Sequence, residues 1–325
     1  TGPYKLVDYQ SGSYLKFEAN ENYYKGEPSI KNVVFQIIEN ADTAILALQN
    51  GEVDAYQMTP QQVKKLDLDA SNLSTYSYSE GRVGYLEINC NRVTDEKVRK
   101  ALLYAMDRKA MDDAAFESSE YYSIPYTFLP TNSQFYTEDG VEKYEQDVDK
   151  AKSMLEDAGV SGLKLKLGYM SSDAVQSAQA LLIQEQLKEV GVTVELAGGD
   201  GTAIANAMKD PDNEYDMYLG GYIMGIDPDT FSSLFENDGA YNYMHYSGYD
   251  TIDQLFEEGR SELDESARKE TYAKLQAAVQ DTGAFYPIIS NNKILVVNNR
   301  IQGVEDAGLV PVYTFEDTSS LKIAE

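Results

Sequence analysis

The first 80 residues alternate apolar and polar positions in short runs, which predicts strands separated by short helices. The predicted elements of this region are strands at 4–9, 14–19, 31–39 and 53–56 and helices at 43–49 and 61–66. Asp42 is expected to cap the first helix, and Pro60 suits the first turn of the second. The region is therefore predicted to be an α/β layer rather than an all-helical one.

Longer helical periods follow. Apolar positions spaced at 3.6 residues predict a helix opened by Thr94, with an inner face of Val98, Ala101, Leu102, Ala105 and Met106. Residues 163–169, 174–190 and 192–196 predict a strand, a helix and a strand, which is a βαβ unit. The other predicted elements are strands at 83–89, 215–219, 285–297 and 310–315 and helices at 149–158, 202–208, 251–263 and 265–280.

The domain organisation follows from chain length and from the absence of a tether. The 325 residues suggest about two domains of roughly 150 residues each. No stretch rich in proline and serine, no low-complexity run and no internal repeat divides the sequence. The two domains are therefore expected to be packed tightly or interleaved.

The net charge of the chain limits the kinds of molecule that it can bind. The chain has 27 Lys and Arg residues against 54 Asp and Glu residues, which gives a formal net charge of −27. Such a chain repels a phosphate backbone and an anionic membrane surface, so nucleic acid is excluded as a partner. No run of about 18 apolar residues is present, so no membrane span is predicted.

Metal and cofactor chemistry finds little support. The single cysteine, Cys90, excludes an internal disulfide framework and a cysteine metal cluster, and the single histidine, His245, excludes a multi-histidine zinc site. Gly199 and Gly201 suggest a dinucleotide loop, but Ile204 occupies the place of its third glycine. We expect no cofactor and no metal.

One pair of acidic residues has two interpretations. Asp227 and Asp229 flank Pro228 and lie close enough in sequence for general acid–base work. The same pattern is typical of a turn, with Asp229 as the cap of a helix over residues 230–236. The cap is the favoured interpretation.

Several blocks, taken in order, resemble the family 5 extracellular solute-binding proteins, which are the peptide-binding receptors of bacterial ABC importers. The blocks are Thr1–Leu6 (TGPYKL), Glu18–Tyr24 (EANENYY), Ala47–Asp54 (ALQNGEVD), Tyr85–Asn89 (YLEIN) followed by Val98–Leu102 (VRKAL) and Ala105–Arg108 (AMDR), and Asp149–Gly159 (DKAKSMLEDAG). Each block alone is weak. Their order and spacing agree with the family from Thr1 to about Tyr313.

The resemblance implies a two-lobed α/β protein of the type II periplasmic-binding-protein-like fold, with mixed sheets flanked by helices and without catalysis. Residues 1–81 and 291–325 would form a discontinuous lobe, and residues 82–290 the other, with ligand held between them. Family members normally have a further ~170–200 residues before the first block, about one domain of typical size. The chain is therefore expected to be a fragment whose discontinuous lobe is incomplete.

The implied partners are a peptide ligand and the membrane permease of an ABC importer. The implied location is extracellular, either as a bacterial cell-surface lipoprotein or in the periplasm, and the implied state is a monomer.

The loop after the strand at residues 215–219 departs from the family. Many members have there an aspartate that receives the amino terminus of the peptide, whereas this sequence has Met224 and Gly225. The ligand is therefore a modified peptide, a longer peptide held by its backbone, or not a peptide. The residues expected to bind ligand are Arg82, Tyr85, Tyr222, Met224, Gly225, Asp227, Asn242, His245, Asn291 and Asn292.

Three alternatives stay open from the sequence. The first is a receptor of the same fold for a sugar or a nickel chelate. The second is a hydrolase that uses Asp227 and Asp229, and the third is a sensor or adhesion module, since fold does not fix function.

Overall fold

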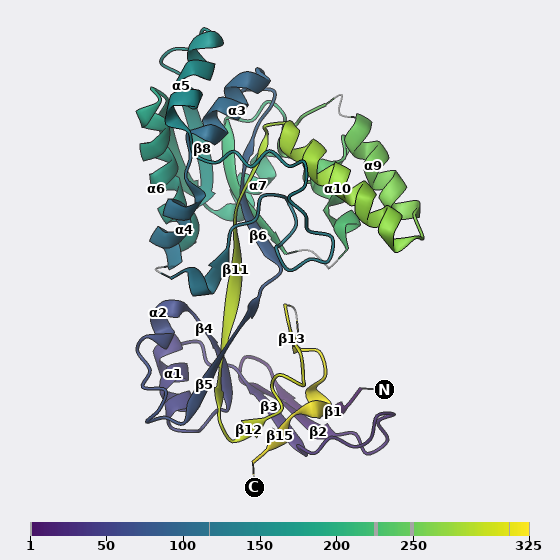
Figure 1. Cartoon of the computed structure of the whole chain (residues 1–325). Coiled ribbons are helices and arrows are strands. Elements are labelled where there is room, and N and C mark those ends of the chain that lie inside the picture. Colours follow the sequence, from purple (N-terminus) through teal and green to yellow (C-terminus); the bar gives the residue numbers. More distant parts are fainter. Residues whose placement is uncertain (1, 117, 224–226, 248–249, 312, 325) are drawn as a thin grey trace. The chain divides into compact units, whose positions relative to one another are not determined.

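The computed structural model describes residues 2–116, 118–223, 227–247, 250–311 and 313–324, and its elements are labelled in Figure 1. Contacts within the chain divide it into two compact units. The first unit contains Thr1–Glu80 and Asn292–Glu325, and the second contains Gly81–Asn291. One strand, β11 (Phe285–Asn298), begins in the second unit and ends in the first.

The second unit is built on a mixed sheet. Its strands are β6 Arg82–Ile88, β7 Tyr122–Ser123, β8 Lys164–Met170, β9 Thr193–Gly199 and β10 Met217–Ile223. Neighbouring strands follow the order β11, β6, β10, β8 and β9, and β7 pairs with β11. β6 is antiparallel to both of its neighbours, whereas β8 is parallel to β10 and to β9. The predicted βαβ unit is confirmed, because α6 (Ala174–Glu189) connects the parallel strands β8 and β9.

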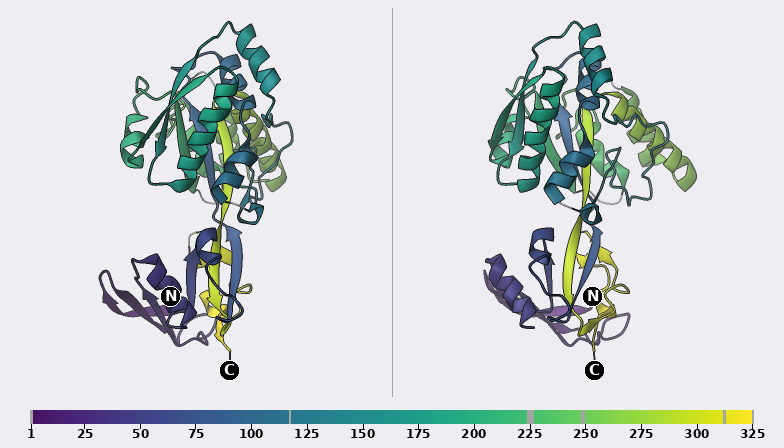
Figure 2. Two further views of the ribbon diagram at one scale, coloured as in Figure 1. Left: turned by 90° about the vertical axis from the view of Figure 1, so that its left-hand side faces the viewer. Right: turned by 60° about the vertical axis from the view of Figure 1, so that its left-hand side comes forward.

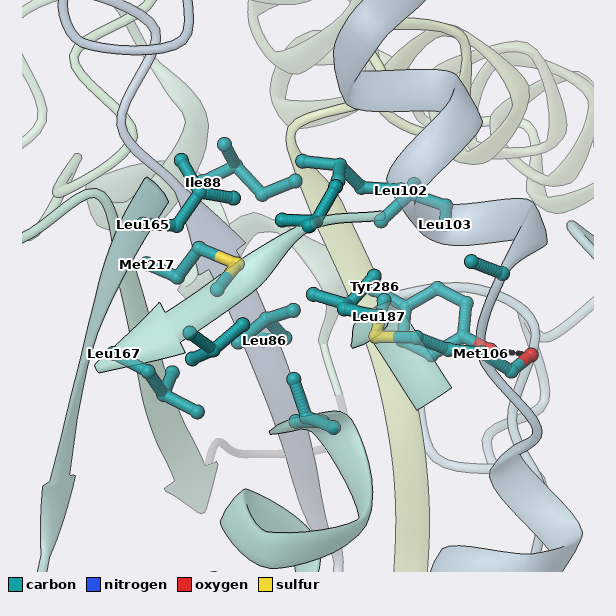
Figure 3. Packing of buried hydrophobic residues seen from close by; sticks show 14 of the residues in the cluster. Leu86, Ile88, Leu102, Leu103, Met106, Leu165, Leu167, Leu187, Met217 and Tyr286 are labelled. Atoms are coloured by element: carbon teal, nitrogen blue, oxygen red, sulfur yellow. Dashed lines mark hydrogen bonds between the residues drawn. The ribbon is translucent and has the colours of Figure 1, made fainter. Parts of the chain in front are cut away.

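Helices cover both faces of this sheet. Their bounds are α3 Glu96–Tyr104, α4 Arg108–Phe116, α5 Val148–Asp157, α7 Gly201–Ala207, α8 Ser232–Phe235, α9 Asp250–Ser261 and α10 Glu265–Asp281, with short 3₁₀ helices η1 Ser119–Tyr121 and η2 Pro228–Phe231. On one face Leu86 and Ile88 of β6 pack with Leu102 of α3 and Leu187 of α6 (Figure 3). On the other face Val83 packs in a cluster with residues of α8, α9 and α10. Figure 2 shows the two sets of helices on the two sides of the strands.

The helix predicted to start at Thr94 begins later and is followed by a second helix. The carboxylate of Asp95, not the side chain of Thr94, caps α3 by accepting the Lys97 N–H at 2.8 Å. The helix ends at Tyr104, and Asp107 accepts the Ala110 N–H at 3.2 Å at the start of α4. A local side-chain hydrogen bond of this kind competes with a continuous helix, so the regular spacing did not predict the break.

The first unit contains smaller sheets. Its strands are β1 Tyr4–Gln10, β2 Tyr14–Ala19, β3 Asn32–Gln36, β4 Ala55–Met58, β5 Leu73–Ser79, β12 Ile301–Gln302, β13 Leu309–Val310, β14 Thr314–Phe315 and β15 Lys322–Ile323. The order in one sheet is β1, β2, β3, while the last part of β11 lies between β4 and β5. A small core of Tyr78, Leu295, Val297 and Val304 holds the strands from the two ends of the chain together.

The helices of the first unit begin at caps that differ partly from the prediction. They are α1 Ala41–Gln49, α2 Pro60–Val63 and the 3₁₀ helix η3 Thr318–Ser320. The predicted Asp42 cap is wrong, because Asn40 accepts the Thr43 N–H at 2.9 Å. Thr59 and Gln62 form a capping box around Pro60, which confirms the predicted start of α2.

The sheet of β1, β2 and β3 has one apolar face that is largely exposed. Because side chains alternate across a strand and the register is known, Leu6, Phe17 and Val33 lie on one face, and Tyr9 and Phe35 flank them. Leu6 is 54% exposed, Tyr9 58% and Phe35 60%. Within the described residues no apolar layer buries this face.

Candidate functional site

The pairing of β6 with β10 brings three of the predicted binding residues, Arg82, Tyr85 and Tyr222, onto one pair of strands. Tyr222 lies opposite Val83, and Gly220 lies opposite Tyr85. A Cβ atom on Gly220 would be 2.5 Å from the ring of Tyr85. Glycine inside a strand marks a close approach of this kind, so Gly220 gives the Tyr85 ring room to lie across β10.

On the opposite face of the two strands, the neighbouring Gly221 likewise leaves room for the side chain of Arg82. A Cβ atom on Gly221 would be 2.0 Å from Nη2 of Arg82, so the guanidinium lies against the backbone of β10. Arg82 is half-buried, and no hydrogen bond or ion pair joins its side chain to any residue that the structure describes. Its charge is thus available to a ligand that carries a carboxylate.

Five tyrosines gather on the face of β6 and β10 that carries Tyr85, and we call Tyr85, Tyr218, Tyr222, Tyr241 and Tyr243 the tyrosine cluster. Ring centroids are 5.8 Å apart for Tyr222 and Tyr241, 6.2 Å for Tyr241 and Tyr243, and 6.0 Å for Tyr218 and Tyr243. Tyr85 and Tyr218 both lie against Gly220. The rings thus connect the two strands with the segment at residues 241–243.

A buried carboxyl lies beside the tyrosine cluster. Glu87 is directly opposite Tyr218 in the strand pairing and shares its face. Its side chain is fully buried, and neither carboxyl oxygen has a hydrogen-bond partner among the described residues. Burial raises the pKa of Glu87 well above its ordinary value, because the charged form loses its hydration.

The tyrosine hydroxyls respond to the same surroundings. Burial raises the pKa of Tyr243 to about 12, with the charge of Glu87 as the next cause. Burial and then Glu87 also raise the pKa values of Tyr85 and Tyr218. All three hydroxyls therefore stay protonated near neutral pH and can both donate and accept hydrogen bonds.

Asp227 and Asp229 are each held by an arginine. Arg268 Nη2 lies 2.8 Å from both carboxylate oxygens of Asp227, and Arg260 lies 2.9 Å from Asp229. Asp227 also accepts the Asp229 N–H at 3.0 Å and caps η2, so the predicted Asp229 cap is wrong. The proline at the first position of η2 explains why the cap falls one residue before it.

Asn242 and His245 lie at a different place on the second unit. Both line a hollow of about 420 Å³, whose other lining residues are Asn91, Lys209, Pro211, Asn237, Asp238, Gly239, Ala240, Tyr243, Tyr246 and Ser247. The Asn242 amide donates to the Glu236 carbonyl at 3.2 Å, and His245 Nε2 lies 2.7 Å from the Met208 carbonyl. Tyr243 belongs to both the hollow and the tyrosine cluster.

The last predicted pair lies within β11. Asn291 pairs with Tyr122 in the second unit, whereas Asn292 pairs with Ser79 in the first. Met224 and Gly225, the departure from the family pattern, lie outside the described residues.

Most residues of this arrangement were not predicted from the sequence to bind a ligand. Tyr218, Tyr241, Tyr243 and Glu87 were overlooked, although the paired glycines at 220 and 221 indicate a close approach within a strand.

No group of three or more His, Cys, Asp or Glu residues able to hold a metal ion occurs in the described part of the chain. Among the described residues, no helix has the length and apolar character needed to cross a bilayer.

Comparison with protein families gives one match that covers most of the chain. The model described as "Bacterial extracellular solute-binding proteins, family 5 Middle" matches residues 1–243. The ABC transporter substrate-binding protein CtaP of Listeria monocytogenes is 38% identical, with a TM-score of 0.93 over 100% of this chain and 67% of CtaP. The AppA protein of Clostridium difficile is 33% identical, with a TM-score of 0.92 over 99% of this chain and 67% of its own.

Among curated relatives, the oligopeptide-binding protein AppA of Bacillus subtilis is 26% identical over 92% of this chain. The chain spans 58% of the length of that relative.

Proposed function

The chain belongs to family 5 of the bacterial extracellular solute-binding proteins, and we propose that it captures peptides as the substrate-binding component of an ABC importer. The observation that carries the proposal is the likeness to CtaP, a substrate-binding protein of this transporter class, at 38% identity and a TM-score of 0.93. The predicted type II periplasmic-binding-protein-like fold is confirmed by the same likeness. The oligopeptide-binding relative supports peptides as the ligand class.

Binding without catalysis is part of the proposal. Asp227 and Asp229, the pair considered for a hydrolase, are each held in an ion pair with an arginine. Burial raises the pKa of Cys90 to about 11, so its thiol is a poor nucleophile at neutral pH. The His245 ring nitrogen Nε2 faces a backbone carbonyl rather than a hydroxyl or thiol. These contacts favour holding a ligand over cleaving it.

We propose different roles for those predicted binding residues that the structure describes. Arg82 binds a carboxylate of the ligand, and Tyr85 and Tyr222 cover apolar groups. Asn242, Asn291 and Asn292 pair with peptide main chain, and His245 contributes to the hollow beside Asn242. Asp227 holds the start of η2 through Arg268 rather than binding the ligand directly.

We further propose that the two units are the two lobes of the receptor, that the protein acts as a monomer outside the cytoplasmic membrane, and that its partner there is the membrane permease. The family consists of extracellular proteins, which supports the location. The charge of −27 supports the absence of a nucleic-acid partner. A lipid anchor at the cell surface is proposed for the Gram-positive case.

The test is a titration of the chain with tri- to nonapeptides by calorimetry, followed by mass spectrometry of the recovered peptides. We expect saturable binding of at least one peptide and recovery of every peptide uncleaved. Cleavage at a rate that Asp227→Asn abolishes would replace the receptor with a hydrolase. Binding of none of the peptides would remove peptides as the ligand class for this chain.

A further inference from the structure

The tyrosine cluster combines aromatic rings with hydroxyls for which the described residues supply no hydrogen-bond partner. No hydroxyl of its five members forms a hydrogen bond with a residue that the structure describes. Tyr241 is 40% exposed and Tyr222 is half-buried, whereas Tyr85 and Tyr243 are buried. A ligand can therefore reach the cluster through the rings of Tyr222 and Tyr241, and the buried rings lie behind them.

Glu87 adds an unsatisfied acceptor at the inner end of the cluster. A buried carboxyl without a hydrogen bond is costly, and native proteins normally give such a group a partner. Residues directly opposite on antiparallel strands have Cβ atoms about 5 Å apart, which places Glu87 beside Tyr218. Tyr218 in turn contacts Tyr243, which connects the carboxyl with the outer rings.

We propose that the tyrosine cluster binds a cationic group, the ammonium or guanidinium of a basic peptide side chain, and that Glu87 is the buried counter-charge behind it. The faces of tyrosine rings attract cations, and phenol and carboxylate oxygens accept the N–H donors that such a group carries. The peptide part of this inference rests on the proposed function, whereas the cation site itself does not.

The protein's own cation near the cluster does not fill this role. Arg82 lies on the opposite face of β10, against Gly221, while the cluster lies on the face of Gly220. Its charge lowers the pKa values of Tyr85 and Tyr218, but these effects are smaller than those of burial and of Glu87. The acceptors on the cluster face thus have no cationic partner among the described residues.

Binding of a cation would be linked to release of a proton from Glu87. Burial favours the neutral acid in the empty site, and a nearby positive charge favours the carboxylate. The titratable groups that face Glu87 are Tyr85 on β6, Tyr218 on β10 and Tyr243 on the covering segment, all of which stay neutral near pH 7, and Arg82 stays charged. The proton released on binding therefore comes from Glu87.

The test compares two pairs of probes that differ in one charged group. The peptides Ala-Lys-Ala and Ala-norleucine-Ala differ in the side-chain ammonium, and butylammonium and butanol, which need no peptide, differ in having an ammonium or a neutral hydroxyl on the same carbon chain. Calorimetry in two buffers of different ionisation enthalpy measures both affinity and proton release. Because the chain has 26 tyrosines and no tryptophan, the part of a tyrosine fluorescence change that Tyr241→Ala removes reports on the cluster independently.

Three variants separate the contributions. Tyr241→Ala removes an exposed ring, and Glu87→Gln keeps the shape of the buried side chain without its charge. Tyr313→Ala is the matched control, because Tyr313 is 81% exposed and belongs to the first unit. We expect the lysine peptide to bind roughly 3- to 30-fold more tightly than the norleucine peptide. Glu87→Gln should abolish proton release, Tyr241→Ala should reduce the preference, and Tyr313→Ala should change neither.

The outcomes distinguish this inference from the proposed function. If both peptides bind equally and Glu87→Gln changes nothing, the cation site is wrong while peptide binding stands. If butylammonium binds in a manner sensitive to Tyr241→Ala but no peptide binds, the cation site stands and the peptide function fails. If neither the ammonium nor the lysine peptide binds, the cation site is overturned, and the titration with tri- to nonapeptides decides the peptide function separately.

Discussion

The two units of this chain follow the same sequence rules but differ in how completely they bury their apolar side chains. In the second unit, Leu86 and Ile88 of β6 are fully buried on one face, and Val83 is fully buried on the other. In the first unit, the apolar face of β1, β2 and β3 leaves Leu6 and Phe35 more than half exposed. Alternation of apolar residues thus predicts which face of a strand seeks burial, but whether another layer covers that face depends on the rest of the protein.

The largest effect that tests this difference comes from a matched pair of phenylalanines. Phe256 of α9 is fully buried in the second unit, whereas Phe35 of β3 is 60% exposed in the first. We expect Phe256→Ala to lower the free energy of unfolding by about 3–5 kcal/mol, through lost burial and the cavity left behind. Phe35→Ala should cost less than about 1 kcal/mol. Urea denaturation measures both, and equal losses would contradict the contrast between the units.

A pair of arginine–carboxylate contacts extends the comparison to ion pairs. Arg268 contacts Asp227, donates to the Gly259 carbonyl at 2.7 Å and lies over the ring of Tyr272. Arg300 contacts Asp54 in the first unit and is half exposed. Because Arg268 has several partly buried partners, Arg268→Gln should cost about 1–3 kcal/mol, whereas Arg300→Gln should cost no more than about 1 kcal/mol. A larger loss for Arg300→Gln in thermal or urea unfolding would reverse this ranking.

A buried acid makes the stability of the second unit dependent on pH. Burial raises the pKa of Asp112 to about 8, against an ordinary value of 3.8, with the nearby Gln179 side chain as the main opposing effect. Between these values the folded protein keeps a proton that the unfolded chain has released, so stability falls as pH rises from about 4 to about 8.

The change Asp112→Asn removes the ionisable group, so the folded and unfolded variant no longer differ by this bound proton. The difference in free energy of unfolding between wild type and variant should change by up to about 1.4 kcal/mol per pH unit across that window, in favour of the variant at high pH. Denaturation at several pH values measures it. A difference that stays constant from pH 4 to pH 8 would show that Asp112 is ionised in the folded protein.

The smallest effect on stability belongs to the exposed face of the first unit. Leu6→Thr removes apolar area that is already in contact with water, so the free energy of unfolding should change by less than about 0.5 kcal/mol. The same change should reduce binding of a dye that fluoresces on exposed apolar surface. Unchanged dye binding would mean that another part of the chain supplies the surface that the dye detects.

Local patterns predicted much of the fold. The strands β1, β2 and β6 and the helices α5, α6 and α10 lie within one or two residues of their predicted positions, because each has a clear period and a polar start or stop. β5 was missed, since its sequence LSTYSYS has few apolar residues and its strand character depends on pairing with β11. The helix caps are Asn40 and Asp227, whereas Asp42 and Asp229 were predicted. The prediction chose the wrong neighbour because several acidic or amide side chains compete at each helix start.

The candidate site was harder to predict for a related reason. Tyr85 and Tyr222 were selected from the family resemblance, but their position on one face, with the Tyr85 ring against Gly220, follows from the register of two strands more than 130 residues apart in sequence. Tyr241 and Tyr243 join them through ring contacts that no local pattern encodes. Glu87 lies in an apolar strand, and the alternation of side chains predicts only on which face of the strand it lies. That its carboxyl is buried without a hydrogen-bond partner among the described residues could not be predicted from the sequence.

Binding of a peptide at the β6–β10 region of the second unit can be tested by hydrogen exchange with and without saturating Ala-Lys-Ala, read by mass spectrometry of fragments. We expect slower exchange in β10 and in residues 239–247 when the peptide is present, while β1, β2 and β3 of the first unit exchange as before. Measurable peptide binding with no change in β10 or in residues 239–247 would contradict it.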